Sequence, residues 1–168
     1  LPYTIFGIKP HVCVDNDATQ QIIDLLEKED FEIRFVVNRQ LTEQECENIY
    51  YKEKTAPDFK KIIVYNSYGP SVIMLLTVKD GDPVQKLKTL CGHADSKIAK
   101  TENPNSLRAK FGEDTIKNAV FCSENPFDAN KERDIFGFPI PQKIPEFKFD
   151  KYLVSKELLW KFLHPPHL

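Results

Sequence analysis

The side chains that could act as nucleophiles or metal ligands are widely scattered in this sequence. They are four cysteines and four histidines: Cys13, Cys46, Cys91, Cys122, His11, His93, His164 and His167. No two cysteines form a Cys-x-x-Cys pair, and no histidine stands at metal-ligand spacing from them. Because disulfide frameworks and zinc sites depend on such spacing, we expect reduced thiols, no bound metal and a reducing compartment.

The charged residues also exclude some classes of partner. The chain has 23 Lys and Arg against 25 Asp and Glu, which gives a net charge of −2, and the two signs are interleaved along it. Nucleic acids and anionic membrane surfaces favour a basic face, so we expect neither as a partner. No apolar run approaches the ~20 residues that a membrane helix needs.

The hydrophobic periodicity of the sequence predicts alternating strands and helices. Strands are predicted over 3–8, 31–37, 71–78 and 119–121. Helices are predicted around 22–29, from 42, over 57–65, from 82 and over 129–136, and a loop with one short helix is predicted over 97–112. The clearest helix starts are the capping box of Thr42 and Glu45 and the Asp82-Pro83 pair.

The order of these elements indicates the fold. The 31–37 segment alternates apolar and polar residues, which indicates a half-buried strand, and the 71–78 segment is apolar on both faces, which indicates a central strand. Helices between the strands favour a mixed or antiparallel sheet with helices on one face. We therefore predict an α/β (α+β) protein with a ferredoxin-like βαββαβ core and a C-terminal extension.

Composition changes after Phe138, so we assign one domain to residues 1–138 and a tail to 139–168. Prolines punctuate the start of the tail, and Ser155 is a candidate cap for a short apolar helix. The apolar side chains of that helix are Leu158, Leu159, Trp160, Phe162 and Leu163. Because so many large apolar groups should not stay in water, the tail either folds back over its own domain or docks on a partner.

Five short segments resemble the nucleoside diphosphate kinase family in order and spacing. They are Ile8-Lys9-Pro10, Leu41-Thr42 leading to Tyr50, Tyr68-Gly69-Pro70, Ser106-Leu107-Arg108-Ala109-x-Phe111-Gly112 and Asn118-Ala119-Val120. The resemblance runs from about Tyr3 to Phe138. It implies the same ferredoxin-like core, a phosphotransfer activity between nucleoside triphosphates and diphosphates, and association into oligomers.

The resemblance also implies roles for particular residues. The phosphate-binding lysine of the family falls on Lys9, a tyrosine near the reacting centre on Tyr50, and a phosphate-binding arginine on Lys88. The arginine of a later loop falls on Arg108, and the asparagine before the reacting histidine falls on Asn118. Fixed cationic donors of this kind suit the oxygens of a phosphoryl group. These five residues are our candidates for a relic nucleotide site.

The departures from the family pattern concern the chemistry itself. Phe121 stands at the position of the reacting histidine, and phenylalanine has no lone pair with which to carry a phosphoryl group. The base-stacking aromatic falls on Asp58, and a phosphate-contacting threonine falls on Ala94. The carboxylate that orients the histidine falls on either Glu132 or Asp134. His11 and Cys122 are the residues that could replace the nucleophile.

Three hypotheses follow. The first is a catalytically inactive domain that serves as a structural or interaction module, similar to the kinase-like domains of ciliary and flagellar proteins. The second is a nucleotide sensor that binds ATP or GTP without transferring phosphate. The third is a working enzyme with another nucleophile, and the chain has no histidine between His93 and His164 to supply one.

The first hypothesis sets the remaining expectations. No cofactor is required, although a Mg-nucleotide is a conceivable ligand. The expected partners are proteins, such as axonemal components or a second kinase-like domain, in a homo- or hetero-oligomer. The expected location is the cytoplasm or the axoneme of a cilium or flagellum. Because the chain begins at Leu1 and not at a methionine, we expect it to be part of a longer protein.

Overall fold

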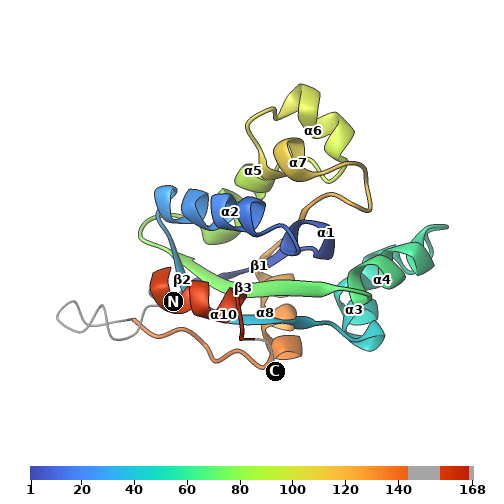
Figure 1. Ribbon diagram of the computed structural model, residues 1–168. Coiled ribbons are helices and arrows are strands. Elements are labelled where there is room, and N and C mark those ends of the chain that lie inside the picture. The colour runs from blue at the N-terminus through green and yellow to red at the C-terminus, as the bar shows by residue number, and fades with distance from the viewer. Residues whose placement is uncertain (144–155, 167–168) are drawn as a thin grey trace.

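The computed structural model of the chain describes residues 1–143 and 156–166. At its centre lies an antiparallel sheet in the order β2-β3-β1-β4 (Figure 1). The strands are β1 (Thr4–Ile8), β2 (Phe31–Gln40), β3 (Pro70–Val78) and β4 (Val120–Cys122). Their order and the intervening helices confirm the ferredoxin-like core. The sheet is antiparallel throughout these pairs, which decides between the two predicted kinds of sheet.

Helices surround the sheet, and several of them are short. The helices in the described part of the chain are α1 (Pro10–Cys13), α2 (Asn16–Lys28), α3 (Glu43–Ile49), the 3₁₀ helix η1 (Tyr51–Glu53), α4 (Phe59–Ser67), α5 (Pro83–Cys91), α6 (Ser96–Glu102), α7 (Leu107–Phe111), α8 (Pro126–Phe136) and α10 (Lys156–Leu163). Within the described ranges, none of them has the length and apolar character that crossing a membrane requires.

Local sequence chemistry begins three of the helices. Asp15 accepts a hydrogen bond from the Ala18 N–H at the start of α2. Asp82 accepts hydrogen bonds from the Val84 and Gln85 N–H groups at the start of α5. Thr42 and Glu45 form the reciprocal capping box of α3. Such side chains satisfy backbone N–H groups that the first helical turn leaves unpaired. The predicted starts at Thr42 and Asp82 are therefore confirmed.

The two faces of the sheet pack against different helices. On one face, Phe6, Val72 and Met74 pack with residues of α2 and α5. On the other, Ile73 and Leu75 pack in a second cluster with residues of α3, α4 and the end of α8. The prediction of helices on one face only was wrong. A strand buried on both sides, as β3 is, needs an apolar cover on both sides.

A β-bulge divides β2 between the two faces. The register against β3 shifts between Ile33 and Phe35, so Phe31 and Ile33 join one core cluster and Phe35 and Val37 join the other. Strict alternation would have placed all four on one face. The extra residue is Arg34, which is buried and donates from Nη2 to the Gln142 carbonyl oxygen at 2.7 Å.

Other predicted bounds also need correction. Helix α1 follows Lys9 directly, because Pro10 occupies a first helical position that requires no N–H donor. The 97–112 segment contains two helices, α6 and α7, and not one. Helix α8 begins at Pro126, three residues before the predicted start, because Asn125 accepts from the Asp128 N–H.

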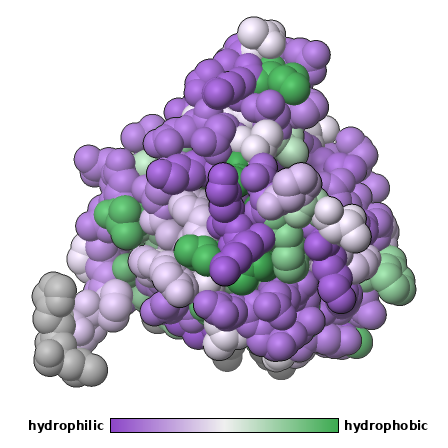
Figure 2. Space-filling model, turned by 90° about the vertical axis from the view of Figure 1, so that its right-hand side faces the viewer, coloured by the Kyte–Doolittle hydropathy of each residue, from purple (hydrophilic) through white to green (hydrophobic). Residues whose placement is uncertain are grey.

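The tail returns to its own domain. Helix α10 lies against β2 (Figure 1), and the Asn38 side chain bonds the carbonyl oxygens of Phe162 and Leu163. The helix ends before Pro165, as predicted, while the predicted cap at Ser155 and the side chains of Leu158 and Leu159 lie outside the described part. The face of the molecule that carries α3 and α4 is mostly hydrophilic, with small separate apolar spots (Figure 2).

Candidate functional site

A cleft of about 320 Å³ opens where β1 ends and β4 begins. Its walls come from the end of α3, η1, the start of α4, α7 and α8. Four of the five predicted site residues line it, namely Lys9, Tyr50, Arg108 and Asn118. The topology therefore brings together groups that are up to 109 positions apart in the sequence, since the antiparallel pairing of β1 with β4 joins the two ends of the chain's core.

Lys9 lies at the base of this cleft in an unusual electrostatic state. Its backbone N–H donates to the Ala119 carbonyl oxygen, and its Nζ lies 5.3 Å from the centre of the Tyr50 ring. Burial, and then the nearby cation of Arg108, lower the pKa of Lys9 to about 7. Part of the lysine population is therefore uncharged at neutral pH.

Arg108 and Asn118 are buried, and each donates side-chain hydrogen bonds to backbone carbonyl oxygens. The two terminal nitrogens of Arg108 donate to the carbonyl oxygens of Gly92 and Val120 at 2.9 and 3.1 Å. Asn118 donates to the Ala94 carbonyl oxygen at 2.8 Å. Arg108 Nε and Asn118 Oδ1 have no partner in the described part of the chain. Two unsatisfied polar atoms at one cleft are a feature of ligand sites, because burial without a partner costs free energy.

Phe121 occupies the wall of the cleft beside these groups. It pairs with Gly7 of β1, and its ring meets that of Tyr50 edge-on at 5.9 Å. A Cβ on Gly7 would lie 2.9 Å from the end of the Ile73 side chain and 3.3 Å from the Phe121 Cβ, so glycine lets both side chains approach β1 closely. Ala119 has a φ of 76°, a strained value for alanine that tends to mark functional sites.

Next to Phe121, Ser123 and Glu132 form a buried pair. The Ser123 hydroxyl donates to Glu132 Oε1 at 2.6 Å, and the Ile5 N–H donates to the Ser123 oxygen. Burial raises the pKa of Glu132 to about 8, although the Ser123 bond opposes that shift. Asp134 points elsewhere and pairs with Arg133 at 2.8 Å. Of the two predicted carboxylates, Glu132 is the one in the cleft.

Comparison with known proteins accounts for this arrangement. The family model for nucleoside diphosphate kinase matches residues 3–139. The chain belongs to the nucleoside diphosphate kinase family. It is 30% identical over 129 residues to the nucleoside diphosphate kinase of Aquifex aeolicus, covering 77% of this chain and 89% of that protein. A solved structure of the Aquifex kinase aligns with a TM-score of 0.74 at 29% identity, over 80% of this chain and 94% of the other.

Longer relatives match as well. Mouse thioredoxin domain-containing protein 6 is 32% identical over 148 residues, which cover 87% of this chain but only 43% of that protein. The chain covers 16% of thioredoxin domain-containing protein 3 homolog from Heliocidaris crassispina, at 34% identity over 131 residues and 77% of this chain. A structure of the Encephalitozoon cuniculi nucleoside diphosphate kinase, at 20% identity, shares the fold with a TM-score of 0.77, over 90% of this chain and 99% of the other.

Within this nucleoside diphosphate kinase domain, the altered positions surround the retained ones. Asp58 and Ala94 both line the cleft. Asp58 is exposed at its mouth, 4.0 Å from Lys61. Lys88, the fifth predicted site residue, is not in the cleft lining, and its Nζ pairs with the Glu124 carboxylate at 3.2 Å. A cation neutralised in this way is a weaker attraction for phosphate.

The two alternative nucleophiles differ in position. His11 lies outside the cleft lining, where its Nδ1 bonds the Tyr65 hydroxyl and its Nε2 lies 3.1 Å from the Phe111 carbonyl oxygen. Cys122 lines the cleft and is nearly buried. A hydrogen bond from Cys91 lowers the pKa of the Cys122 thiol to about 7, assisted by Arg108. This activating partner is 31 positions away, and nothing in the sequence near Cys122 indicated it.

Sequence reasoning also missed a polar cluster at the rim of the cleft. Asp128 is buried and accepts hydrogen bonds from the Tyr51 hydroxyl, Lys52 and Asn125. The Lys131 Nζ lies 3.3 Å from the centre of the Tyr51 ring. In the described part of the chain no three His, Cys, Asp or Glu residues are grouped as a metal site would need. The cluster ties η1 to α8 and so shapes one wall of the cleft.

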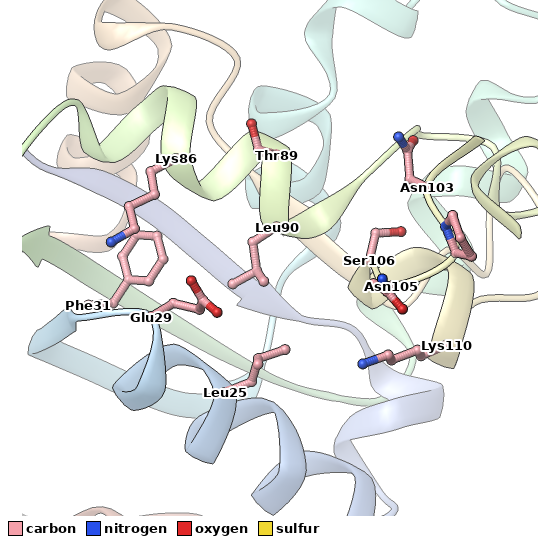
Figure 3. A pocket seen from close by; sticks show the side chains of 11 residues that line it. Leu25, Glu29, Phe31, Lys86, Thr89, Leu90, Asn103, Asn105, Ser106 and Lys110 are labelled. Carbon is pink, nitrogen blue, oxygen red and sulfur yellow. The ribbon is translucent and has the colours of Figure 1, made fainter.

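A larger hollow lies on the opposite side of Arg108's helix, between α2, α5 and the loop before α7 (Figure 3). It has a volume of about 530 Å³ and an apolar floor that includes Leu25 and Leu90. Lys86 lies over the Phe31 ring at 5.3 Å, and Lys110 extends from α7. Its charged groups are at least partly exposed. The smaller cleft, with its buried ionisable groups, is therefore the candidate site.

Proposed function

We propose that this domain is a catalytically inactive member of the nucleoside diphosphate kinase family that serves as a structural or interaction module in a larger ciliary or flagellar protein. The proposal rests on Phe121. Its ring stands beside the Ser123–Glu132 pair and packs on Tyr50 at the place of the reacting histidine. Covalent phosphate transfer needs a nucleophilic nitrogen at that place, and a phenyl ring offers none.

The surrounding groups support the same proposal. The lowered pKa of Lys9 leaves it only partly charged at neutral pH. Two nitrogens of Arg108 already donate hydrogen bonds to backbone carbonyl oxygens. The exposed carboxylate of Asp58 at the mouth repels a polyphosphate. Each of these features weakens the electrostatic stabilisation on which phosphoryl transfer depends.

The longer relatives support a role inside a larger protein. Thioredoxin domain-containing proteins contain the matching region as 16% to 43% of their length in the two examples above. The tail helix also presents large apolar groups to solvent, with Trp160 53% and Phe162 41% exposed. Exposed aromatic side chains of this kind are frequent anchors of protein interfaces.

The test of inactivity is a two-step transfer assay. The purified domain is incubated with γ-labelled ATP and magnesium and then with GDP, with the Aquifex kinase as the positive control and circular dichroism as proof of folding. We expect neither labelled protein nor labelled GTP. Label that passes from the protein to GDP would contradict the proposal, and Cys122→Ser would then identify the acceptor.

The interaction role has its own test. Binding of the purified domain to demembranated axonemes is compared with that of a Trp160→Glu variant, whose substitution lies on the exposed side of α10. We expect at least a tenfold loss of affinity, because a buried interface tryptophan is commonly worth about 2 kcal/mol or more. Equal binding, or no binding by either protein, would contradict an axonemal role for this surface.

A second candidate function is nucleotide binding without transfer. The side chains of Lys9 and Arg108 in the cleft lining favour it, because cationic donors suit phosphate oxygens. Lys9 and Arg108 would then contact phosphate oxygens, and the magnesium ion bound to the nucleotide would offset its charge.

The pH dependence of binding separates this candidate from the first. Because the protonated form of Lys9 attracts phosphate and its pKa is about 7, affinity for Mg-ATP should fall as pH rises. Between pH 6 and pH 8 the expected loss is about tenfold. Lys9→Met should abolish the thermal shift with nucleotide, whereas Lys110→Met, outside the cleft, should preserve it. The absence of any shift at millimolar Mg-ATP would exclude nucleotide binding.

A further inference from the structure

Cys91 and Cys122 form a pair of thiols beside the cleft. Cys91 is the last residue of α5, and Cys122 is the last residue of β4. The helix and the strand pack against each other, and both cysteines belong to the same core cluster. The Cys91 thiol donates a hydrogen bond to the Cys122 sulfur, and both thiols are free. The fold therefore holds two reduced sulfur atoms next to each other, which is the arrangement from which a disulfide forms.

The two thiols differ in access. Cys122 lines the cleft of about 320 Å³, although little of its surface is exposed. Cys91 is fully buried and is not part of the cleft lining. A small reagent that enters the cleft therefore meets Cys122 first, and it reaches Cys91 only through Cys122. This is the order of access of a reacting thiol that is backed by a resolving thiol.

The accessible thiol is also the one that ionises more easily. The hydrogen bond from Cys91 lowers the pKa of Cys122 to about 7 against the effect of burial. The cations of Arg108 and Lys88 lower it further, and the Glu124 carboxylate opposes them. Burial, and then the bond to Cys122, raise the pKa of Cys91. Because the thiolate is the reactive form, Cys122 is the nucleophile of the pair and Cys91 keeps its proton until Cys122 has reacted.

The other two cysteines of the chain lack these properties. Cys13 is partly exposed, and burial raises the pKa of its thiol to about 11. Cys46 lies in the other core cluster, and burial raises the pKa of its thiol to about 12. Exposure alone therefore favours reaction at Cys13, whereas thiolate character favours reaction at Cys122. An experiment can separate these two causes within one chain.

We propose that Cys122 is an oxidation site for hydroperoxides and that Cys91 completes the reaction by forming a disulfide with it. The Cys122 thiolate attacks one peroxide oxygen, the O–O bond breaks, and Cys122 becomes a sulfenic acid. The other oxygen leaves and takes up the proton that Cys122 released. The Cys91 sulfur then attacks the Cys122 sulfur, the S–O bond breaks, and hydroxide leaves with the Cys91 proton as water. Two electrons pass from the sulfur atoms to the peroxide, and a dithiol reductant restores both thiols.

The disulfide also changes the charge of the candidate site. Burial and the cation of Arg108 lower the pKa of Lys9, and the Cys122 thiolate opposes them. Oxidation removes this anion, so the pKa of Lys9 falls further and less of the lysine is protonated at neutral pH. The inference holds whether or not the domain transfers phosphate, because no nucleotide takes part in it.

The first test uses the unmodified full chain, reduced and then freed of reductant. The protein is incubated with hydrogen peroxide at neutral pH, remaining thiols are alkylated in denaturant, and peptides are identified by mass spectrometry. We expect the four free thiols to fall to two, with the peptides of Cys91 and Cys122 joined. Cys122 should be consumed about tenfold or more faster than Cys13. Dithiothreitol should restore all four thiols.

Three variants assign the roles within the pair. Cys91→Ser should stop at a sulfenic acid on Cys122, recorded as a dimedone adduct. Cys122→Ser should leave Cys91 unreacted, because Cys91 is reached only through Cys122. Cys13→Ser is the matched control and should form the disulfide at the rate of the unmodified chain.

Several outcomes would overturn the proposal. Oxidation of Cys13 or Cys46 before Cys122 would show that thiolate character does not select the site. Oxidised Cys122 without a bond to Cys91 in the unmodified chain would show that the pair does not form a disulfide. Both results come from the unmodified chain, so they do not depend on whether a variant folds. Oxidation of Cys91 in a folded Cys122→Ser variant would contradict the order of the two steps.

Discussion

The cleft around Phe121 and the edge of β2 under α10 differ in how they are built. The cleft lies in the part of the chain that matches the family model, and its groups are polar, buried and electrostatically altered, as Lys9 and Glu132 show. The β2 edge is apolar, and its cover comes from residues beyond the matched 3–139 region. The cleft brings Lys9, Tyr50, Arg108 and Asn118 together around Phe121. The β2 edge is in contact with a helix that lies beyond the matched region.

Substitutions in the cleft and at the β2 edge should therefore have different effects. In the cleft, a substitution alters charge and proton affinity, because the groups are buried in a low-dielectric environment. At the edge, a substitution alters how firmly α10 is held against β2.

The largest effect is expected from Phe121→His. It restores an imidazole beside the Ser123–Glu132 pair and near Lys9, so we expect a change from no label to an acid-labile phosphoprotein after incubation with γ-labelled ATP and magnesium. Phe121→Ala, which removes the ring without supplying a nucleophile, should remain unlabelled. If a folded Phe121→His variant takes no label, the changes at Asp58 and Ala94 are enough to abolish transfer, and the frame of the cleft is not retained.

The next largest effect is expected from Arg108→Ala. The substitution leaves the carbonyl oxygens of Gly92 and Val120 without their donors, so the free energy of unfolding should fall by about 3 kcal/mol. Arg39→Ala, which removes only a surface ion pair with Glu45, should cost less than about 1 kcal/mol. Urea denaturation monitored by circular dichroism measures both. Equal losses would mean that Arg108 is not a structural part of the cleft.

Glu132→Gln should have an effect that depends on pH. The folded protein holds a proton on Glu132 up to its pKa of about 8, whereas the unfolded chain releases it near 4.5. Stability is therefore lost as pH rises between these values, and the amide removes this loss. We expect the variant to be more stable than the unmodified chain by roughly 4 kcal/mol at pH 8 and equal to it at pH 4. A difference independent of pH would show that Glu132 is not protonated in the folded protein.

The smallest effect is expected at the β2 edge. Asn38→Ala removes two hydrogen bonds to the end of α10 and should lower the local stability of that helix by about 1 kcal/mol, with little change in global unfolding. Hydrogen exchange of residues 156–163 measures the local effect, and urea denaturation measures the global one. A global loss as large as that of Arg108→Ala would show that the contact of α10 with β2 contributes to the stability of the whole domain.

Much of the fold could be predicted because its signals are local. The capping box of Thr42 and Glu45 and the N-cap of Asp82 act within four residues, and the apolar run of β3 indicates a central strand by itself. The bulge at Arg34 could not be predicted, because alternation continues through it in the sequence. It is decided by the pairing with β3 and by the contact of Arg34 with the Gln142 carbonyl.

The candidate site shows the same division. Lys9, Tyr50, Arg108 and Asn118 were predicted to share a site, and they line one cleft. Lys88 was predicted from the family resemblance, but it is not in the lining, and its charge is paired with the carboxylate of Glu124, which is. The contacts of Cys122 with Cys91 and of Ser123 with Glu132 were not predicted, because each joins residues that only the tertiary structure brings together.

The sequence by itself determined the ferredoxin-like core, the family and the absence of a histidine at position 121, since these depend on residue identity and on the order of periodic segments. Only the tertiary structure decided that the pKa of Lys9 is lowered, that the pKa of Glu132 is raised, and that α10 lies against β2. The physical reason is that burial and long-range contact set proton affinity and surface exposure. Both quantities depend on which distant residues meet, and local sequence carries little information about that.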